Sequence, residues 1–162
     1  MFVSVYGTLK RGFSNGSLLK GSEFIGECYV PGKLYVYGLP FLKVNKKYVC
    51  GEGVPYMFEE DNLFFDETDF NVPMVSCEMY RINKGILPVL DTLEGFNGKE
   101  NMYERVLVKC LLREKPMTSW VYHYPGGVVE NTFIESGKYV LDDFQPNRNL
   151  NNIREEEIYA NV

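Results

Sequence analysis

Short runs of apolar and aromatic residues, separated by Gly, Pro and Asn, recur along the chain and predict a structure made mostly of strands. β-Branched and aromatic residues concentrate in the segments 2–6, 24–30, 33–37, 48–58, 75–82, 103–112 and 119–124. In the last of these segments Trp120, Tyr122 and Tyr124 occupy alternate positions, which places their rings on one face of a strand. The pattern is typical of a β-rich domain.

Helical periodicity is limited to short segments. Residues 86–94 place apolar side chains at helical spacing, with Pro88 early enough to be tolerated and Gly95 as the expected stop. A short capped turn is expected at 14–19, and a terminal helix prone to fraying at 152–160. Helices are thus expected to be few and short.

Length, composition and charge bound the class of protein. A chain of 162 residues, 45% apolar and 15% aromatic, is expected to form one globular domain with a core of its own. The net charge of −5, with no cluster of Lys and Arg among aromatic residues, argues against a nucleic-acid partner. No apolar run has the length of a membrane span, and Met1-Phe2-Val3 lacks the basic region typical of a signal peptide. We therefore expect a cytoplasmic location and no membrane partner.

The cysteines and the single histidine do not form a recognisable metal or nucleophile motif. The chain has no C-x-x-C pair among its cysteines, which are Cys28, Cys50, Cys77 and Cys110. A tetrathiolate zinc site is therefore not expected, and buried reduced thiols are favoured. His123 is interpreted as a structural or solvent-exposed residue, so a Ser-His-Asp or Cys-His site is not supported.

Acidic residues concentrate in the segment 45–74, where residues 59–69 include six acids and no base. A solvated surface loop explains such a composition. Phenylalanines within the acidic run, among them Phe64 and Phe65, are also compatible with a lid or a partner-binding face. The acids lack the ordered spacing of a calcium-binding loop.

Two places in the sequence carry candidate chemistry. Gly7 directly follows the first expected strand, where a glycine lets a ligand approach the backbone and exposed N–H groups can hold an oxyanion. A plain connecting turn is the alternative. Glu94 ends the apolar helical segment and precedes Gly95, so partial burial can raise the pKa of its carboxyl group toward the range useful for proton transfer. A surface glutamate is the alternative there.

Several motifs follow one another along the chain. They are Tyr6-Gly7-Thr8-Leu9-Lys10-Arg11-Gly12, Val75-Ser76-Cys77-Glu78-Met79-Tyr80-Arg81-Ile82, Leu90-Asp91-Thr92-Leu93-Glu94-Gly95, Tyr103-Glu104-Arg105, Trp120-Val121-Tyr122 and Glu135-Ser136-Gly137-Lys138-Tyr139. In this order, over residues 2–139, they resemble the gamma-glutamylcyclotransferase-like family. Cys77 stands where that family usually has glycine, and the acidic segment is an insertion relative to the family's pattern.

The resemblance implies an α+β fold, a small mixed β-barrel with a few short helices and a cavity at one side. Residues 1–144 are expected to form this domain, with the insertion at 45–74 and a polar tail at 145–162. The implied reaction is the closure of a γ-glutamyl compound by its own α-amine, which releases 5-oxoproline and an amine. It needs no cofactor, no metal and no protein nucleophile. Nothing in the sequence specifies the leaving amine or an oligomeric state.

The resemblance also implies roles for individual residues. Glu94 falls on the family's general acid/base. The substrate-binding residues are expected to be Tyr6, Gly7, Thr8, Leu9, Arg105 and Tyr122. For Arg105, pairing with a structural carboxylate is an equal alternative, and for Tyr122 the alternative is core packing. A non-catalytic small-molecule binding protein with the same cavity is the second hypothesis, suggested by Cys77 and the insertion. An interaction module using the acidic, aromatic loop is the third.

Overall fold

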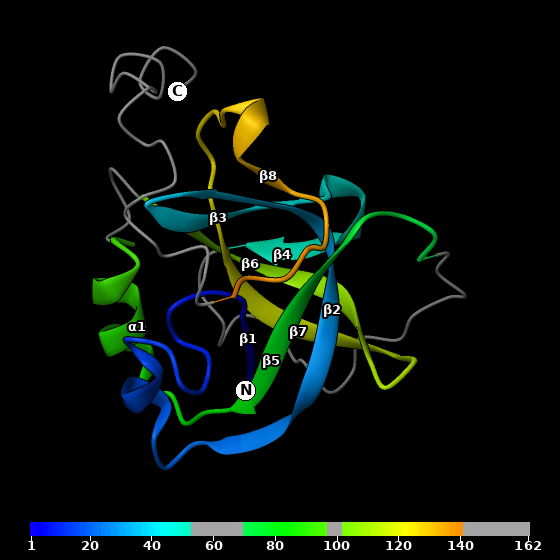
Figure 1. Ribbon diagram of the computed structural model, residues 1–162. Helices are drawn as coiled ribbons and strands as arrows, with labels where there is room; N and C mark the ends of the chain where they lie inside the picture. Colours follow the sequence, from blue (N-terminus) through cyan, green and yellow to red (C-terminus); the bar gives the residue numbers. More distant parts are fainter. Residues whose placement is uncertain (53–69, 97–101, 141–162) are drawn as a thin grey trace.

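The described part of the chain is a strand-rich domain with one short α-helix (Figure 1). The computed structural model describes residues 1–52, 70–96 and 102–140. The strands are β1 (Phe2–Val5), β2 (Glu23–Tyr37), β3 (Leu39–Val44), β4 (Val49–Glu52), β5 (Met74–Arg81), β6 (Glu104–Leu112), β7 (Lys115–His123) and β8 (Phe133–Ile134). The helical elements are α1 (Leu87–Leu93) and the 3₁₀ turns η1 (Gly16–Leu19), η2 (Lys46–Tyr48) and η5 (Glu130–Thr132).

Five strands close into a barrel in the order β2, β5, β1, β7 and β6, because β6 pairs back onto β2. The neighbours are antiparallel except β1 and β7, which run parallel where Val3 faces Trp120. β3 and β8 extend the second half of β2, and β4 pairs with β6. The architecture confirms the expected α+β class and the small mixed β-barrel.

Apolar side chains are buried on both faces of β6 and β7. Val106 and Val121 belong to a cluster to which all barrel strands except β1 contribute, and which fills the barrel interior. Leu107 and Trp120 alternate with them and belong to a second cluster, which also contains Leu90 of α1. In Figure 1, α1 lies outside the barrel, beside the loop that follows β1. The helix that carries the candidate acid is therefore packed onto the barrel wall.

β2 is one continuous strand, whereas the sequence predicts a break between residues 30 and 33. Pro31 is the last residue of β2 that pairs with β5, opposite Met74. Gly32 is the first that pairs with β3, opposite Val44. The Pro-Gly pair thus marks the point where β2 changes its partner from β5 to β3. Proline is tolerated at this point, where one ladder ends and the next begins, although its nitrogen has no hydrogen to donate.

β3 and the first half of β7 are absent from the sequence prediction. β3 contains Pro40, which lowers its strand signal, but it lies at the edge of the sheet, where proline is tolerated. β7 begins at Lys115 because Arg113 and Glu114, both at positive φ, form a tight turn after β6. The pairing of β6 with β7 holds this turn in place, although neither Arg113 nor Glu114 is a residue that usually forms such turns.

Several sequence predictions concern residues outside the described ranges. The acidic run at 59–69, with Phe64 and Phe65, and the terminal helix at 152–160 are among them. At the described end of the insertion, the Phe70 ring packs against Tyr48, with ring centroids 5.5 Å apart. Of the helices in the described ranges, none has the length and apolarity that crossing a bilayer requires.

Candidate active site

A pocket of about 100 Å³ opens where the loop after β1 faces the C-terminal end of α1. Residues 6–9, Glu94 and Tyr122 all line it, so the structure brings these sequence-predicted residues to one cavity. The other lining residues are Ser4, Val5, Asn15, Leu39, Pro40, Leu93, Met102 and Tyr103.

Glu94 is positioned by the way in which α1 ends. Gly95 adopts a φ of +64°, a conformation that glycine reaches without strain. The N–H of Phe96 donates to the Asp91 carbonyl (2.9 Å), as in the Schellman motif that terminates many helices. The Glu94 carbonyl accepts the N–H of Tyr103 (3.2 Å), directly before β6. The backbone of Glu94 is therefore held between α1 and the start of β6.

Burial of the Glu94 carboxyl group raises its pKa to about 7. Burial also raises the pKa values of Tyr6 and Tyr103, and the charge of Glu94 raises both further. These two hydroxyls donate away from the acid, Tyr6 to the Tyr122 carbonyl (2.7 Å) and Tyr103 to the Pro40 carbonyl (2.8 Å). A carboxyl group with a pKa near neutrality can both accept and return a proton near neutral pH.

The loop after β1 supplies backbone donors to the pocket. The carbonyls of Gly7 and Thr8 accept the N–H groups of Lys10 (3.1 Å) and Asn15 (2.8 Å). The N–H groups of Gly7, Thr8 and Leu9 donate to no oxygen atom in the described part of the chain. Consecutive backbone N–H groups of this kind can bind a carboxylate or an oxyanion.

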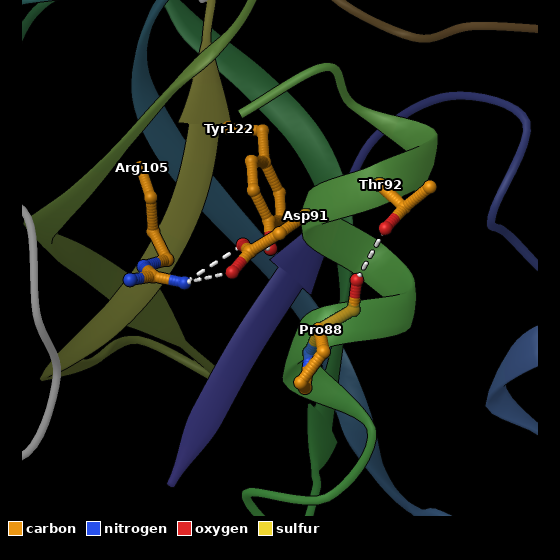
Figure 2. A network of polar contacts seen from close by, with 5 residues as sticks. All are labelled: Pro88, Asp91, Thr92, Arg105 and Tyr122. Atoms are coloured by element: carbon orange, nitrogen blue, oxygen red, sulfur yellow. Dashed lines mark hydrogen bonds and ion pairs between the residues drawn. The ribbon is translucent and has the colours of Figure 1, made fainter. Parts of the chain in front are cut away.

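Arg105 does not line the pocket and instead pairs with Asp91 of α1. The Arg105 Nη1 lies 2.7 Å from both Asp91 carboxylate oxygens, and the Tyr122 hydroxyl donates to Asp91 Oδ1 at 2.5 Å. Figure 2 shows Asp91 projecting from the helix toward both partners. The network joins α1 to β6 and β7, and so helps to fix the helix end that carries Glu94. The structural pairing considered for Arg105 is thus present, and its contact with a ligand stays a prediction.

Asp91, Pro40 and Tyr103 are the main contributors that the sequence prediction lacks. Asp91 stands three residues before Glu94 in the same helical motif. An acidic residue within a short apolar helix indicates that its carboxylate pairs with a cation when the helix is packed against the core. Pro40 comes from a segment without a motif, and Tyr103 opens the Tyr103-Glu104-Arg105 motif, in which the resemblance implies a role for Arg105 alone. The pairing of β2 with β3 places Pro40 in the pocket wall, and the hydrogen bond from the Tyr103 hydroxyl to the Pro40 carbonyl places Tyr103 beside it.

Cys77 lies in the barrel interior, opposite Cys28 on β2, and does not line the Glu94 pocket. All four cysteines are free, and three are buried while Cys50 is partly exposed. His123 is not among the residues that line the pocket. The described residues contain no group of three or more His, Cys, Asp or Glu side chains arranged to hold a metal ion.

We expect Gly7→Ala to distort the pocket wall. A Cβ atom at Gly7 would stand 2.4 Å from Pro40 Cγ, well inside van der Waals contact. Because the Pro40 carbonyl also holds the Tyr103 hydroxyl, relief of the clash must displace that wall. The free energy of unfolding should fall by about 1–3 kcal/mol. Denaturant unfolding measures the change, and a midpoint equal to that of the wild type would contradict the close packing.

The raised pKa of Glu94 has a consequence for stability. The folded chain holds the Glu94 proton up to about pH 7, whereas the unfolded chain releases it near the ordinary value of 4.5. Stability is therefore lost as the pH rises between these values, on the order of 2 kcal/mol after allowance for partial exposure. Glu94→Gln removes this loss, so its melting temperature should exceed that of the wild type by about 4–8 °C at pH 8.5. The two proteins should melt together at pH 4, and a pH-independent difference would contradict the burial of the carboxyl group.

Solved structures share this barrel. An uncharacterized protein of Pyrococcus horikoshii is 20% identical, with a TM-score of 0.58 over 85% of this chain and 88% of its own. A mouse AIG2-like protein is 19% identical, with a TM-score of 0.59 over 86% of this chain and 87% of its own. Comparison with curated proteins yields no significant match. The two structures establish a shared fold.

The family follows from the sequence as a whole. The family model described as gamma-glutamyl cyclotransferase, AIG2-like, matches residues 3–141. The chain therefore belongs to the AIG2-like gamma-glutamyl cyclotransferase family. Membership indicates an enzyme of the cyclotransferase type.

Proposed function

We propose that this protein cyclises a γ-glutamyl compound to 5-oxoproline and a free amine, with Glu94 as the general acid/base. The observation that carries the proposal is the convergence of a carboxyl group of pKa about 7 and a loop with available backbone N–H groups on one pocket. A carboxyl group of this pKa and an oxyanion site are what intramolecular amide cleavage requires.

The reaction can be written with atoms and protons balanced. The carboxylate of Glu94 accepts a proton from the substrate's α-ammonium group, and the freed amine attacks the γ-carbonyl carbon. A five-membered ring forms, and the carbonyl oxygen carries the negative charge of the tetrahedral intermediate. Glu94 returns its proton to the leaving nitrogen, and the bond between that nitrogen and the carbonyl carbon breaks. The ring nitrogen, which carries a positive charge after the attack, gives up its extra proton through the Glu94 carboxylate to the freed amine, which leaves as an ammonium ion. Holding amine and carbonyl in contact supplies up to about 7–11 kcal/mol of the barrier reduction.

The other residues are assigned roles around this step. The N–H groups of residues 7–9 are the proposed donors to the oxyanion or to the substrate's α-carboxylate. Tyr122 lines the pocket and bonds to Asp91. Asp91 and Arg105 are proposed as positioning residues, because they hold α1 against β6 without lining the pocket.

The test is to incubate the purified protein with a γ-glutamyl amide and to measure 5-oxoproline and amine. Both products should appear in equal amounts, at a rate proportional to protein concentration. Recovery of bound, unchanged amide would instead support the non-catalytic binding protein. Of the two features that suggested this alternative, Cys77 lies in the barrel interior and is not among the residues that line the Glu94 pocket.

A further inference from the structure

The mouth of the Glu94 pocket carries exposed apolar side chains from separate elements. Leu39 begins β3, Leu93 ends α1, and Met102 lies two residues before the start of β6. They are 41%, 39% and 43% exposed, and all three line the pocket. Isolated apolar residues are common on protein surfaces, but the convergence of several on one cavity marks a binding surface. We call these three residues the apolar rim.

The rim lies beside both parts of the proposed chemistry. Leu93 is the chain neighbour of Glu94, and the Met102 N–H donates to the Gly95 carbonyl at 3.1 Å. On the other side, Leu39 precedes Pro40, whose ring packs against Gly7. A substituent on a nitrogen atom that Glu94 protonates would therefore lie close to the rim.

The charges that line the pocket also favour an apolar substituent on the leaving amine. Among the described residues that line it, Glu94 is the only Asp, Glu, Lys, Arg or His. Beyond Glu94, a charged group at the far end of the leaving amine would find no opposite charge among the described residues that line the pocket, and it would lose hydration against the three apolar side chains. An apolar group would instead remove the rim from water.

We propose that the substrates are γ-glutamyl amides of uncharged, apolar primary amines, whose alkyl or aryl group packs on Leu39, Leu93 and Met102. This rests on the proposed function. It goes further by naming the chemical class of the leaving amine and the residues that select it.

The test compares three γ-glutamyl amides with the same four-carbon chain: those of butylamine, 1,4-diaminobutane and 4-aminobutanoate. The kcat/KM for 5-oxoproline release should be at least about tenfold higher for the butyl amide than for either charged amide. A charged amide that is used equally well or better overturns the inference while the proposed function stands.

Variants identify the rim as the source of selectivity. Leu93→Ser and Met102→Ser should each lower the ratio of kcat/KM between the butyl and methyl amides about three- to tenfold. Val89→Ser is the matched control, because Val89 is 47% exposed on the same helix, one turn before Leu93, and does not line the pocket. An unchanged ratio in both rim variants, or an equal fall in Val89→Ser, overturns the inference.

Binding measurements separate this inference from the proposed function. If no amide releases 5-oxoproline, the proposed function fails, and calorimetric titration of the wild type with the three amides still reports on the rim. Tighter binding of the butyl amide, weakened in Met102→Ser, then supports the apolar rim as a selecting surface. Equal or tighter binding of a charged amide overturns it.

Discussion

Glu94→Gln is expected to lower the kcat for 5-oxoproline release by about 10²–10⁴-fold, the usual contribution of a positioned acid/base. Glutamine has nearly the shape of glutamate, so the pocket should keep its form and its affinity for the substrate. The side-chain amide can neither accept the α-ammonium proton nor protonate the leaving nitrogen. The loss should therefore appear in kcat rather than in substrate binding.

Steady-state assays of product release, with calorimetric titration of the same amide, measure the two effects separately. Glu23→Gln is the matched control, because its side chain is 61% exposed and pairs with Arg81 at the surface. That variant should turn over like the wild type. Activity of Glu94→Gln within a few-fold of the wild type would remove this residue from the mechanism.

Asp91→Ala is expected to reduce the free energy of unfolding by about 3 kcal/mol. The Arg105 side chain is only 5% exposed, and without its partner the guanidinium group would be a buried, uncompensated charge. The Tyr122 hydroxyl would lose its acceptor as well. A loss of this size corresponds to a fall in melting temperature of about 6–12 °C.

Equilibrium denaturation in urea measures the loss. Glu23→Ala breaks the exposed pair with Arg81, where the side chains are 61% and 56% exposed, and should change stability by less than about 1 kcal/mol. If Asp91→Ala is as harmless as this control, the buried pair does not hold α1 in place. The milder Asp91→Asn keeps one oxygen acceptor, so its loss of unfolding free energy should lie between those of Asp91→Ala and Glu23→Ala.

The local signals in the sequence predict the parts of the site that depend on chain neighbours. Gly95 ends α1 as its position in the motif predicts, because a left-handed residue after a helix is a local requirement. The partner of Arg105 is different, since Asp91 and Arg105 meet only when α1 packs onto β6. A tertiary contact of this kind leaves no trace in periodicity or turn residues.

The fold shows the same division between local and tertiary effects. The residues of β1, β5 and β6 carry strong strand patterns and are found in strands close to the expected bounds. The Pro31-Gly32 pair reads as a break in any local pattern, yet β2 continues because β3 replaces β5 as its partner there. In β7, Trp120 and Val121 are both fully buried, so the alternation of apolar and polar residues that marks a one-sided strand is missing.

The position of β1 in the barrel has a consequence for the order of folding. Val3 pairs with Tyr80 on one side and with Trp120 on the other. The first strand of the chain can therefore complete its pairing only with two strands that are distant in sequence. Loop closure of this length slows folding, and no local hairpin can complete the barrel in advance. The loop that forms one wall of the pocket is attached to β1, so we expect it to become ordered only after β1 has paired with both β5 and β7. Amide hydrogens of β1 should therefore exchange with solvent through global unfolding, at the rate of the most protected core.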